Sequence, residues 1–372
     1  MSLGLYLHLP FCRVHCSYCP FAISTDLSLQ DAYTGALLRE IDAKSSLPAA
    51  RGEGSSIVDT LYLGGGTPSR LARSNLRLII DRVRSRFVIA PGAEVTIEAN
   101  PEDIDDEALA DWQELGVNRI SIGVQSFHDA ELLPLGRVHG AQRALDAVKL
   151  AVSKGLRTSL DLILSLPNQT VASFRETLRT AIGLNVGHIS LYMLDLEEGT
   201  PLAVQVERGR TTLPEEDDVA ALYLEAVGTL GEAGLQQYEI SNFARPGEES
   251  RHNLRYWRRE PYHGLGLGAH SFLAEQRFAN TRDIRRYIAD PVDARDFEEE
   301  LGEAEQRRET IFLRLRQASG IGYADLVRLT GQEGMEWTER GLRDGWLRRE
   351  GARVAFTPSG FLLSNEHISS LF

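Results

Sequence analysis

Residues 4–19 read GLYLHLPFCRVHCSYC, a run of strand-forming residues that leads directly into three cysteines. Cys12, Cys16 and Cys19 are the only cysteines among the 372 residues, so a framework of disulfides is excluded. Three thiolates on one compact loop can each bind one iron of a cubane cluster, which leaves the fourth iron open to a small molecule. The spacing therefore predicts an open-site [4Fe–4S] cluster after the first strand.

A zinc site is the alternative for the same loop. His8 or His15 could complete a Cys3His set with the three cysteines. Structural zinc sites, however, usually take their ligands from two separated pairs, and here all the cysteines lie within eight residues. The clustering therefore favours iron–sulfur chemistry.

Six short apolar runs alternate with five segments of helical periodicity in the first half of the chain. The apolar runs cover residues 4–9, 57–63, 94–100, 118–125, 157–164 and 188–194. The helical segments cover residues 28–44, 69–86, 105–115, 140–154 and 170–183. This alternation predicts a parallel α/β sheet buried on both faces, either an open doubly wound sheet or a partial barrel. In both architectures the loops at the carboxyl ends of the strands hold the site.

Polar residues and glycines lie at the carboxyl ends of these predicted strands. The second strand is followed by Gly64–Thr67, the third ends at Glu98 and Asn100, and the fourth ends at Gln125. Asp161 lies in the fifth strand and Tyr192 in the sixth. Because the carboxyl ends of parallel strands share one edge of a sheet, we expect these residues to converge near the cysteines.

The second half of the chain has a different pattern. We expect a helix near residues 215–233, a short strand QYEI, and a loop region rich in glycine and aromatic residues over 241–278. The charge-dense stretch 296–309 suggests a boundary or an exposed helix start. The tail predicts three helices, a hairpin that turns at Glu350-Gly351 and a final helix. The expected parts are a barrel at 1–235, an extension at 236–295 and a C-terminal, mostly helical winged-helix-like domain at 296–372.

The charge of the chain argues against nucleic acid as a partner. With 40 basic and 53 acidic residues the net charge is −13, so a polyanion is repelled unless a basic patch is segregated. The winged-helix-like tail is therefore expected to be a packing domain. No apolar run is long enough for a transmembrane helix and no secretory signal is visible, and clustered thiols favour a reducing compartment, so we expect a cytoplasmic protein.

The cysteine motif together with GGGTPS at 64–69 resembles the radical S-adenosylmethionine (SAM) superfamily. Further strings extend the resemblance to the oxygen-independent coproporphyrinogen III oxidase family and its haem-chaperone (HemW) branch. These strings are EANP at 98–101, GVQSF at 123–127, LGRVH at 135–139, DLILSLPNQT at 161–170, YEISNFARPGEESRHNLRYW at 238–257 and GLGLGAHS at 264–271. They cover nearly the whole chain. The resemblance implies a partial (β/α)6 barrel with the [4Fe–4S] cluster at its top and SAM on the open iron.

The resemblance also implies which residues contact SAM: Tyr6, Tyr18, Gly65, Gly66, Thr67, Glu98, Gln125, Arg137 and Asp161. Each has a plainer interpretation. The two tyrosines could serve aromatic packing, the glycine loop could be an ordinary turn, and Asp161 could be a structural carboxylate. The resemblance assigns no catalytic side chain.

Residues 252–257, HNLRYW, resemble the haem-chaperone branch in particular. An imidazole can ligate haem iron axially, and Tyr or Trp rings can pack on the macrocycle. The motif therefore implies that His252 binds haem, whereas a lone histidine is more often structural.

Two departures from the coproporphyrinogen oxidases favour the chaperone branch. Phe21 stands where those enzymes carry a fourth cysteine, and the first strand begins near residue 4 without a preceding extension. The expected function is a haem chaperone that binds the cluster, SAM and haem and delivers haem to an acceptor protein, for which a membrane-associated protein is one candidate. The alternative is a coproporphyrinogen III dehydrogenase that decarboxylates propionate side chains oxidatively. Ser165 and Asn168 each replace a usual glycine, and Leu267 replaces a usual proline.

Overall fold

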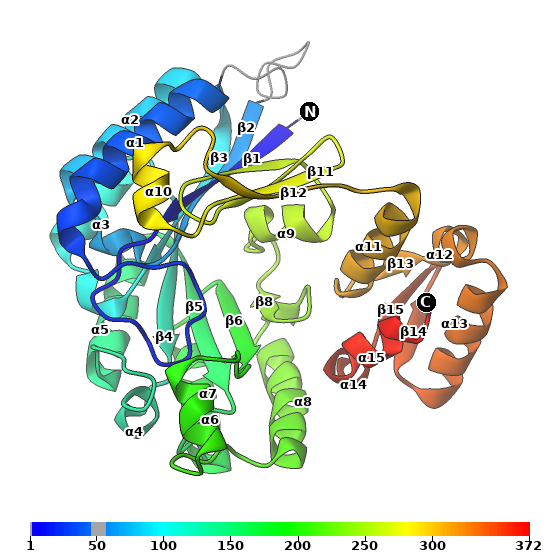
Figure 1. Ribbon diagram of the computed structural model, residues 1–372. Helices are drawn as coiled ribbons and strands as arrows, with labels where there is room; N and C mark the ends of the chain where they lie inside the picture. Colours follow the sequence, from blue (N-terminus) through cyan, green and yellow to red (C-terminus); the bar gives the residue numbers. More distant parts are fainter. Residues whose placement is uncertain (1, 46–56) are drawn as a thin grey trace. The chain divides into compact units, whose positions relative to one another are not determined.

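The computed structural model describes residues 2–45 and 57–372 and separates the chain into two compact units (Figure 1). The first unit consists of Met1–Gly187, Tyr192–Pro214 and Pro261–Glu300. The second consists of His188–Leu191, Glu215–Glu260 and Leu301–Phe372.

A largely parallel sheet forms the centre of the first unit. Five strands pair in parallel in chain order: β1 (Ser2–Leu9), β2 (Ile57–Gly65), β3 (Ile89–Ala99), β4 (Arg119–Gln125) and β5 (Arg157–Leu164). On the other side of β1 the sheet continues through β9 (Tyr262–Leu265), which is parallel to β1, and then through the antiparallel strands β10 (His270–Leu273), β11 (Gln276–Asn280) and β12 (Arg295–Glu300). A sixth strand of the alternation, β6 (His188–Met193), begins in the second unit and ends in the first.

Helices separate the parallel strands along the chain. They are α1 (Gln30–Lys44), α2 (Arg73–Arg86), α3 (Asp106–Glu114), α4 (Asp129–Leu132), α5 (Ala141–Ser153) and α6 (Val171–Gly183), followed after β6 by α7 (Pro201–Glu207) and, beside α1, by α10 (Ile284–Ala289). Figure 1 shows α1, α2, α3 and α5 along the outer side of the strands. Local chemistry fixes their starts: the Asp105 side chain accepts a hydrogen bond from Ala108 N, and Thr170 and Ser173 form a capping box.

Burial on both faces explains the continuous apolar runs. Neighbouring residues of a strand point to opposite faces, and both are buried at Leu7 and His8 of β1, 0% and 6% exposed, and at Ile120 and Ser121 of β4, 0% and 8% exposed. The predicted strands and helices of this half of the chain are confirmed within a few residues at most ends. The predicted α/β architecture, a parallel sheet with helices and a small, mostly helical C-terminal part, is confirmed as well.

The second unit holds α8 (Glu216–Glu232), the short antiparallel strands β7 (Gln236–Gln237) and β8 (Asn242–Ala244), and α9 (Arg251–Trp257). Its C-terminal part contains α11 (Glu303–Leu315), β13 (Ile321–Gly322), α12 (Tyr323–Thr330), α13 (Gln332–Asp344), β14 (Leu347–Glu350), β15 (Arg353–Phe356), α14 (Pro358–Leu362) and α15 (Ser364–Ser369). The predicted hairpin at Glu350-Gly351 is confirmed, because β14 and β15 pair antiparallel with Glu350 opposite Arg353.

Two expectations for the second half are wrong. The region 241–278, expected as loop, contains β8, α9, β9, β10 and the first residues of β11. The cause is backbone packing that apolar periodicity does not reveal: a Cβ at Gly264 would lie 2.1 Å from the carbonyl oxygen of His270. The strand expected over QYEI, residues 237–240, is reduced to Gln236–Gln237.

The charged stretch 296–309 is confirmed both as a boundary and as an exposed helix start. The first unit ends at Glu300 and the second resumes at Leu301, and the exposed start of α11 lies at Glu303.

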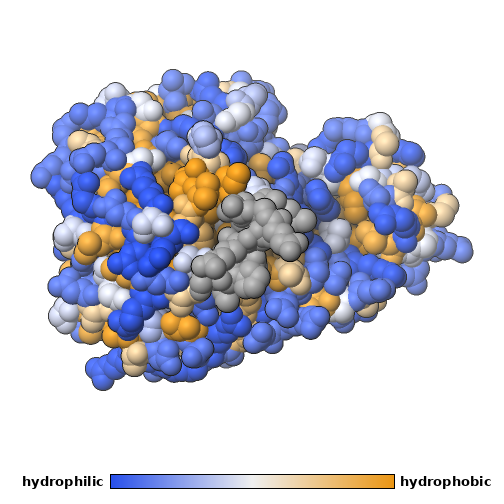
Figure 2. Space-filling view, turned by 90° about the horizontal axis from the view of Figure 1, so that it is seen from above, coloured by the Kyte–Doolittle hydropathy of each residue, from blue (hydrophilic) through white to orange (hydrophobic). Residues whose placement is uncertain are grey.

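The boundaries of the two units differ from those of the three parts expected from the sequence. Residues 236–295 are shared between the units, because β9, β10 and β11 extend the sheet of the first unit whereas α9 belongs to the second. Hydrophilic residues predominate on the face seen from above the view of Figure 1, with smaller hydrophobic areas between them (Figure 2). Within residues 2–45 and 57–372, none of the helices combines the length and the apolar character that crossing a bilayer requires.

A backbone strain test follows from Ser165, which has a φ of 72° in the left-handed region. Replacing Ser165 by glycine removes this strain and should raise the free energy of unfolding by about 0.5–1 kcal/mol after the entropy cost of glycine. The measurement is urea unfolding followed by tryptophan fluorescence. Asn168→Gly is the matched control, because Asn168 has a φ of 64° but tolerates it better and donates a hydrogen bond to Ala130 O. A destabilised Ser165→Gly would contradict the strain argument.

Candidate functional site

A pocket of about 460 Å³ lies in the first unit, at the carboxyl ends of the parallel strands. Nearly all of the residues predicted as site residues line it, namely Cys12, Cys16, Tyr18, Cys19, Gly65, Gly66, Thr67, Glu98, Gln125, Arg137 and Asp161. Tyr6 and His252 do not line the pocket. The strand ends and the cysteines therefore converge on one pocket, as expected.

The cysteine loop is held by backbone and side-chain hydrogen bonds on both sides of its thiols. Cys12 N donates to Ser24 O at 3.0 Å, and Cys19 N donates to Cys16 O at 3.2 Å. Ser17 Oγ donates to Pro134 O at 2.8 Å, which fastens the middle of the loop to the segment before Arg137. The three thiols are partly exposed and line the same pocket.

The glycine loop after β2 must approach the cysteine loop closely. Gly66 N donates to Leu9 O at 3.0 Å, and a Cβ at Gly66 would lie 2.5 Å from the carbonyl carbon of Pro10. Gly65 has a φ of 108°, and a Cβ there would lie 2.5 Å from the His8 ring. Only glycine allows this approach, so the loop is more than an ordinary turn.

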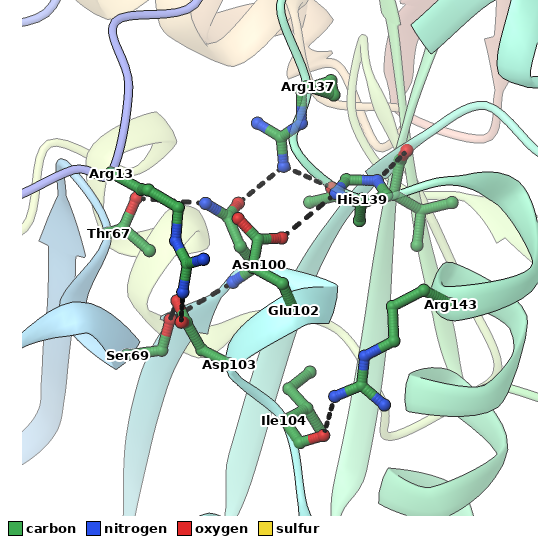
Figure 3. Close-up of polar contacts among 12 residues, drawn as sticks. Arg13, Thr67, Ser69, Asn100, Glu102, Asp103, Ile104, Arg137, His139 and Arg143 are labelled. Carbon is green, nitrogen blue, oxygen red and sulfur yellow. Dashed lines mark hydrogen bonds and ion pairs between the residues drawn. The ribbon is translucent and has the colours of Figure 1, made fainter.

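A chain of hydrogen bonds connects two of the cysteines, and Figure 3 shows its middle part, from Thr67 through Asn100 to Arg137. Thr67 Oγ1 donates to Cys12 Sγ at 3.2 Å, and Asn100 Nδ2 donates to Thr67 Oγ1 at 3.2 Å. Arg137 Nη2 donates to Asn100 Oδ1 at 2.6 Å and to Gly123 O at 2.8 Å. Arg137 Nη1 reaches Cys16 Sγ at 3.6 Å. The chain thus runs from one thiol to another through the ends of β2 and β3.

The donor set fits a [4Fe–4S] cluster. Burial raises the pKa of Cys12 to about 11, although the Thr67 hydrogen bond acts in the opposite direction, and burial also raises the pKa of Cys19. A thiol binds iron as the thiolate, so metal binding releases its proton, and the nearby Arg137 cation favours that anion. Arg137 Nε is buried and has no hydrogen-bond partner in the part of the chain that the structure describes. That N–H remains to be satisfied by a group in the pocket.

No three His, Cys, Asp or Glu side chains of the described residues surround a point where a single metal ion could be held. Three thiolates that each bind a different iron atom of a cubane cluster need not converge on one point.

Two carboxylates face the inner part of the pocket. Glu98 accepts hydrogen bonds from Tyr62 OH at 2.8 Å and from Gly65 N at 3.0 Å. Burial raises the pKa of Glu98 to about 7, and the Asp161 charge adds to that rise. Asp161 accepts from Ser121 Oγ at 3.1 Å and lines the pocket. Such carboxylates can bind an ammonium group or sugar hydroxyls.

Asn100 and Tyr192, which were expected near the cysteines because they lie at strand ends, also line the pocket. Two further pocket residues were not predicted. Ser121 lines the pocket, and Glu102 pairs with His139 Nδ1 at 3.2 Å beside Arg137 (Figure 3). Ser121 lies in β4, so its position in the alternation carries the signal that could have found it. Nothing in the local sequence marks the Glu102–His139 pair.

Tyr18 lines the pocket and packs against a buried cluster that contains Leu135 and Leu166. Tyr6, in contrast, lies beside the site: its ring stacks on Tyr62 with centroids 6.1 Å apart, and its hydroxyl contacts His8 Nδ1 at 3.2 Å. Aromatic packing therefore describes Tyr6 in this structure.

His252 belongs to α9 in the second unit and is not in a loop. It is 1% exposed, and its Nε2 lies 2.8 Å from Tyr256 OH. Burial lowers the pKa of His252 to about 3. In this conformation the imidazole is packed inside the unit and does not present a nitrogen to solvent.

Comparison with known proteins agrees with this geometry. The radical SAM superfamily matches over residues 6–181. The haem chaperone HemW of Mycobacterium tuberculosis is 36% identical over 99% of this chain and 94% of its own length, and that of Bacillus subtilis is 33% identical over 97% of each. The coproporphyrinogen III oxidase HemN of Escherichia coli has a similar structure, with a TM-score of 0.85 over 100% of this chain and 90% of its own, at 24% identity. That likeness concerns the fold alone.

The pKa of Glu98 predicts a pH dependence of stability. Because its pKa rises from 4.5 to about 7 in the folded protein, the contribution of Glu98 to the free energy of unfolding is fully present below pH 4.5 and is lost as the pH rises through 7. The free energy of unfolding of Glu98→Gln should therefore increase relative to that of the wild type, by up to about 3 kcal/mol between pH 4.5 and 8, in protein without SAM. Urea unfolding across this pH range measures the difference. A difference that stays constant with pH would show that Glu98 has the same pKa in the folded and unfolded states, which would contradict the prediction.

Arg137→Lys tests the hydrogen-bonded chain. An ammonium group cannot reproduce the guanidinium contacts to Asn100, Gly123 and Cys16, so we expect a loss of about 2 kcal/mol in the free energy of unfolding. Arg143→Lys is the control, because Arg143 makes one hydrogen bond, to Ile104 O, outside the pocket. Equal losses in the two variants would contradict the central place of Arg137.

Proposed function

The chain belongs to the radical SAM superfamily and, within it, to the HemW family of haem chaperones, and we propose that it binds haem and delivers it to an acceptor protein. One observation carries the proposal: the 36% identity to the Mycobacterium tuberculosis haem chaperone extends over 99% of this chain. The similarity therefore includes both the pocket and the second unit with its HNLRYW motif.

The superfamily implies a [4Fe–4S] cluster and SAM. We propose that Cys12, Cys16 and Cys19 hold three irons of the cluster and that SAM occupies the rest of the pocket. When bound, the cluster and SAM supply one-electron chemistry in this superfamily. Whether or not that chemistry is used, the residues of this chain bind and orient the two groups and keep water out of the pocket.

The charges of the pocket suit SAM, which carries an ammonium, a carboxylate and ribose hydroxyls. Glu98 and Asp161 are acceptors for the ammonium or for hydroxyl groups, and Gln125 offers an amide beside them. Arg137 Nε, buried and without a hydrogen-bond partner within the described residues, is a donor for the carboxylate. Gly65 and Gly66 leave room for SAM near the cysteine loop.

The HNLRYW motif implies that His252 is the ligand of the haem iron. Iron ligation would require the contact between His252 Nε2 and Tyr256 OH to break and the buried side of α9 to open. The α9 helix spans only Arg251–Trp257, so this is a small segment to rearrange. That α9 contains a haem site is part of this motif-based proposal.

The chemistry of the cysteines bears on the compartment, and the cargo bears on the acceptor. Free thiols and an oxygen-sensitive cluster fit a reducing compartment, so we place the protein in the cytoplasm. The acceptor is a protein that takes up haem, and a membrane-associated acceptor is compatible with the proposal.

A coproporphyrinogen III dehydrogenase is the alternative function. Its support is the similarity of fold to HemN, at 24% identity. Phe21, which is exposed in the cysteine loop where the notional fourth cysteine of that family would stand, argues for the chaperone.

The test of the proposal is a haem titration of anaerobically reconstituted protein, followed by the Soret band. We expect a saturable band in the wild type, and ligation of the iron by His252 predicts a shifted or lost band in His252→Ala. His188→Ala is a closely matched control: His188 is also buried in the second unit, and its Nε2 also lies 2.8 Å from a tyrosine hydroxyl, that of Tyr238.

Absence of a saturable band in the wild type would overturn the chaperone proposal. Formation of protoporphyrinogen from coproporphyrinogen in an anaerobic, SAM-dependent assay would then establish the alternative. Equal losses of the band in His252→Ala and His188→Ala would remove His252 as the ligand and leave the binding of haem itself in place.

A further inference from the structure

The mouth of the pocket is surrounded by apolar side chains that are exposed to solvent. Val14, Phe21, Val138, Tyr192 and Met193 line the pocket and are at the same time among the exposed large hydrophobic residues of the described chain; we call them the apolar rim. Phe21 is the most exposed of them, at 62%. Exposed apolar side chains that gather around a pocket mark a surface that a ligand or partner covers.

An imidazole lies on the same loop as two members of the apolar rim. His15 is exposed, lines the pocket, and its Nε2 is 3.0 Å from the carbonyl oxygen of Cys19. Because a carbonyl oxygen only accepts, Nε2 of the neutral ring carries the proton and Nδ1 keeps its lone pair. A backbone carbonyl that holds the N–H of a histidine in this way is the usual support of a metal-ligating imidazole.

We propose that haem binds at the mouth of the pocket, with its macrocycle against the apolar rim and its iron ligated by His15 Nδ1. The inference rests on the binding of haem in the proposed function and replaces His252 as the iron ligand, because it places the cargo beside the cluster pocket and on a residue that the family motif does not include. Haem fits this chemistry: a flat, mostly apolar disc with a Lewis-acidic centre.

The size of the pocket places haem outside it. A volume of about 460 Å³ is within the range that a single small-molecule ligand fills. The cluster and SAM occupy this interior, so the surface left for a third group is the rim. His252, in contrast, is 1% exposed and lies in the other unit.

Charge gives the bound haem an orientation. The side chain of Arg13 is 44% exposed and only loosely paired with Asp103, at 3.9 Å. Asp195 and Glu197 also line the pocket and are exposed carboxylates. The two propionates of haem therefore point towards Arg13 and away from Asp195 and Glu197.

The experiment is an anaerobic haem titration of reconstituted protein with two variants of the mouth, His15→Ala and Phe21→Ser. We expect each variant to bind haem at least tenfold more weakly, and the Soret band of His15→Ala to move to the position of haem without its histidine ligand. Free imidazole should return the band of His15→Ala to the wild-type position, which a folding defect would not allow. Iron and sulfide contents confirm that each variant keeps its cluster.

Matched controls exist for both variants. His128 also has its Nε2 3.0 Å from a backbone carbonyl, that of Ser173, but does not line the pocket. Leu78 is 53% exposed on α2, also away from the pocket. His128→Ala and Leu78→Ser should bind haem as the wild type does.

The outcomes separate this inference from the proposed function. If the wild type binds haem and His15→Ala and Phe21→Ser bind it equally well, the rim is not the haem site, and the chaperone proposal stands. Loss of binding in His252→Ala with His15→Ala unaffected would likewise overturn the inference in favour of α9. If the wild type binds no haem, both the proposed function and the inference fall.

Discussion

The guanidinium of Arg137 is buried, and a buried cation is tolerated only where acceptors surround it. Arg137 finds them in three parts of the first unit: the Asn100 side chain after β3, the carbonyl of Gly123 in β4, and Cys16 in the cysteine loop. The same contacts hold the loop of three thiols against the strand ends. Thr67, bonded to Asn100 and Cys12, closes the chain on the other side. This one charge thus joins three walls of the pocket.

Close backbone approach is the second condition for the pocket. Gly65 and Gly66 bring the end of β2 against β1, where a Cβ would collide with His8 or Pro10. The space so gained faces the thiols, and Glu98 accepts the Gly65 N–H at its inner side. Apolar side chains and His15 lie at its mouth. The arrangement therefore runs from a polar interior, suited to SAM and a cluster, to an apolar opening, suited to a porphyrin.

The parallel half of the fold could be predicted because its strands are buried on both faces and read as continuous apolar runs, such as Leu5, Leu7 and Leu9 of β1. Strand ends then predicted the positions of Glu98, Gln125 and Asp161 in one pocket. The strands β9 to β11 could not be predicted in the same way, since they are short and pair through close backbone contacts at Gly264. The burial of His252 could not be predicted either, because the HNLRYW motif gives the residue types but does not show how the helix that contains them is packed. The contact between Arg137 and Asn100 joins residues 37 positions apart, and no local pattern records it.

The central claim is that one chain carries haem together with its cluster. Native mass spectrometry of anaerobically reconstituted protein after addition of haem tests it most directly, because it counts the groups on each molecule. The account predicts chains that carry one [4Fe–4S] cluster and one haem at the same time. Haem found only on chains that lack the cluster would mean that it binds to vacant cysteine thiols, and that result would contradict the account.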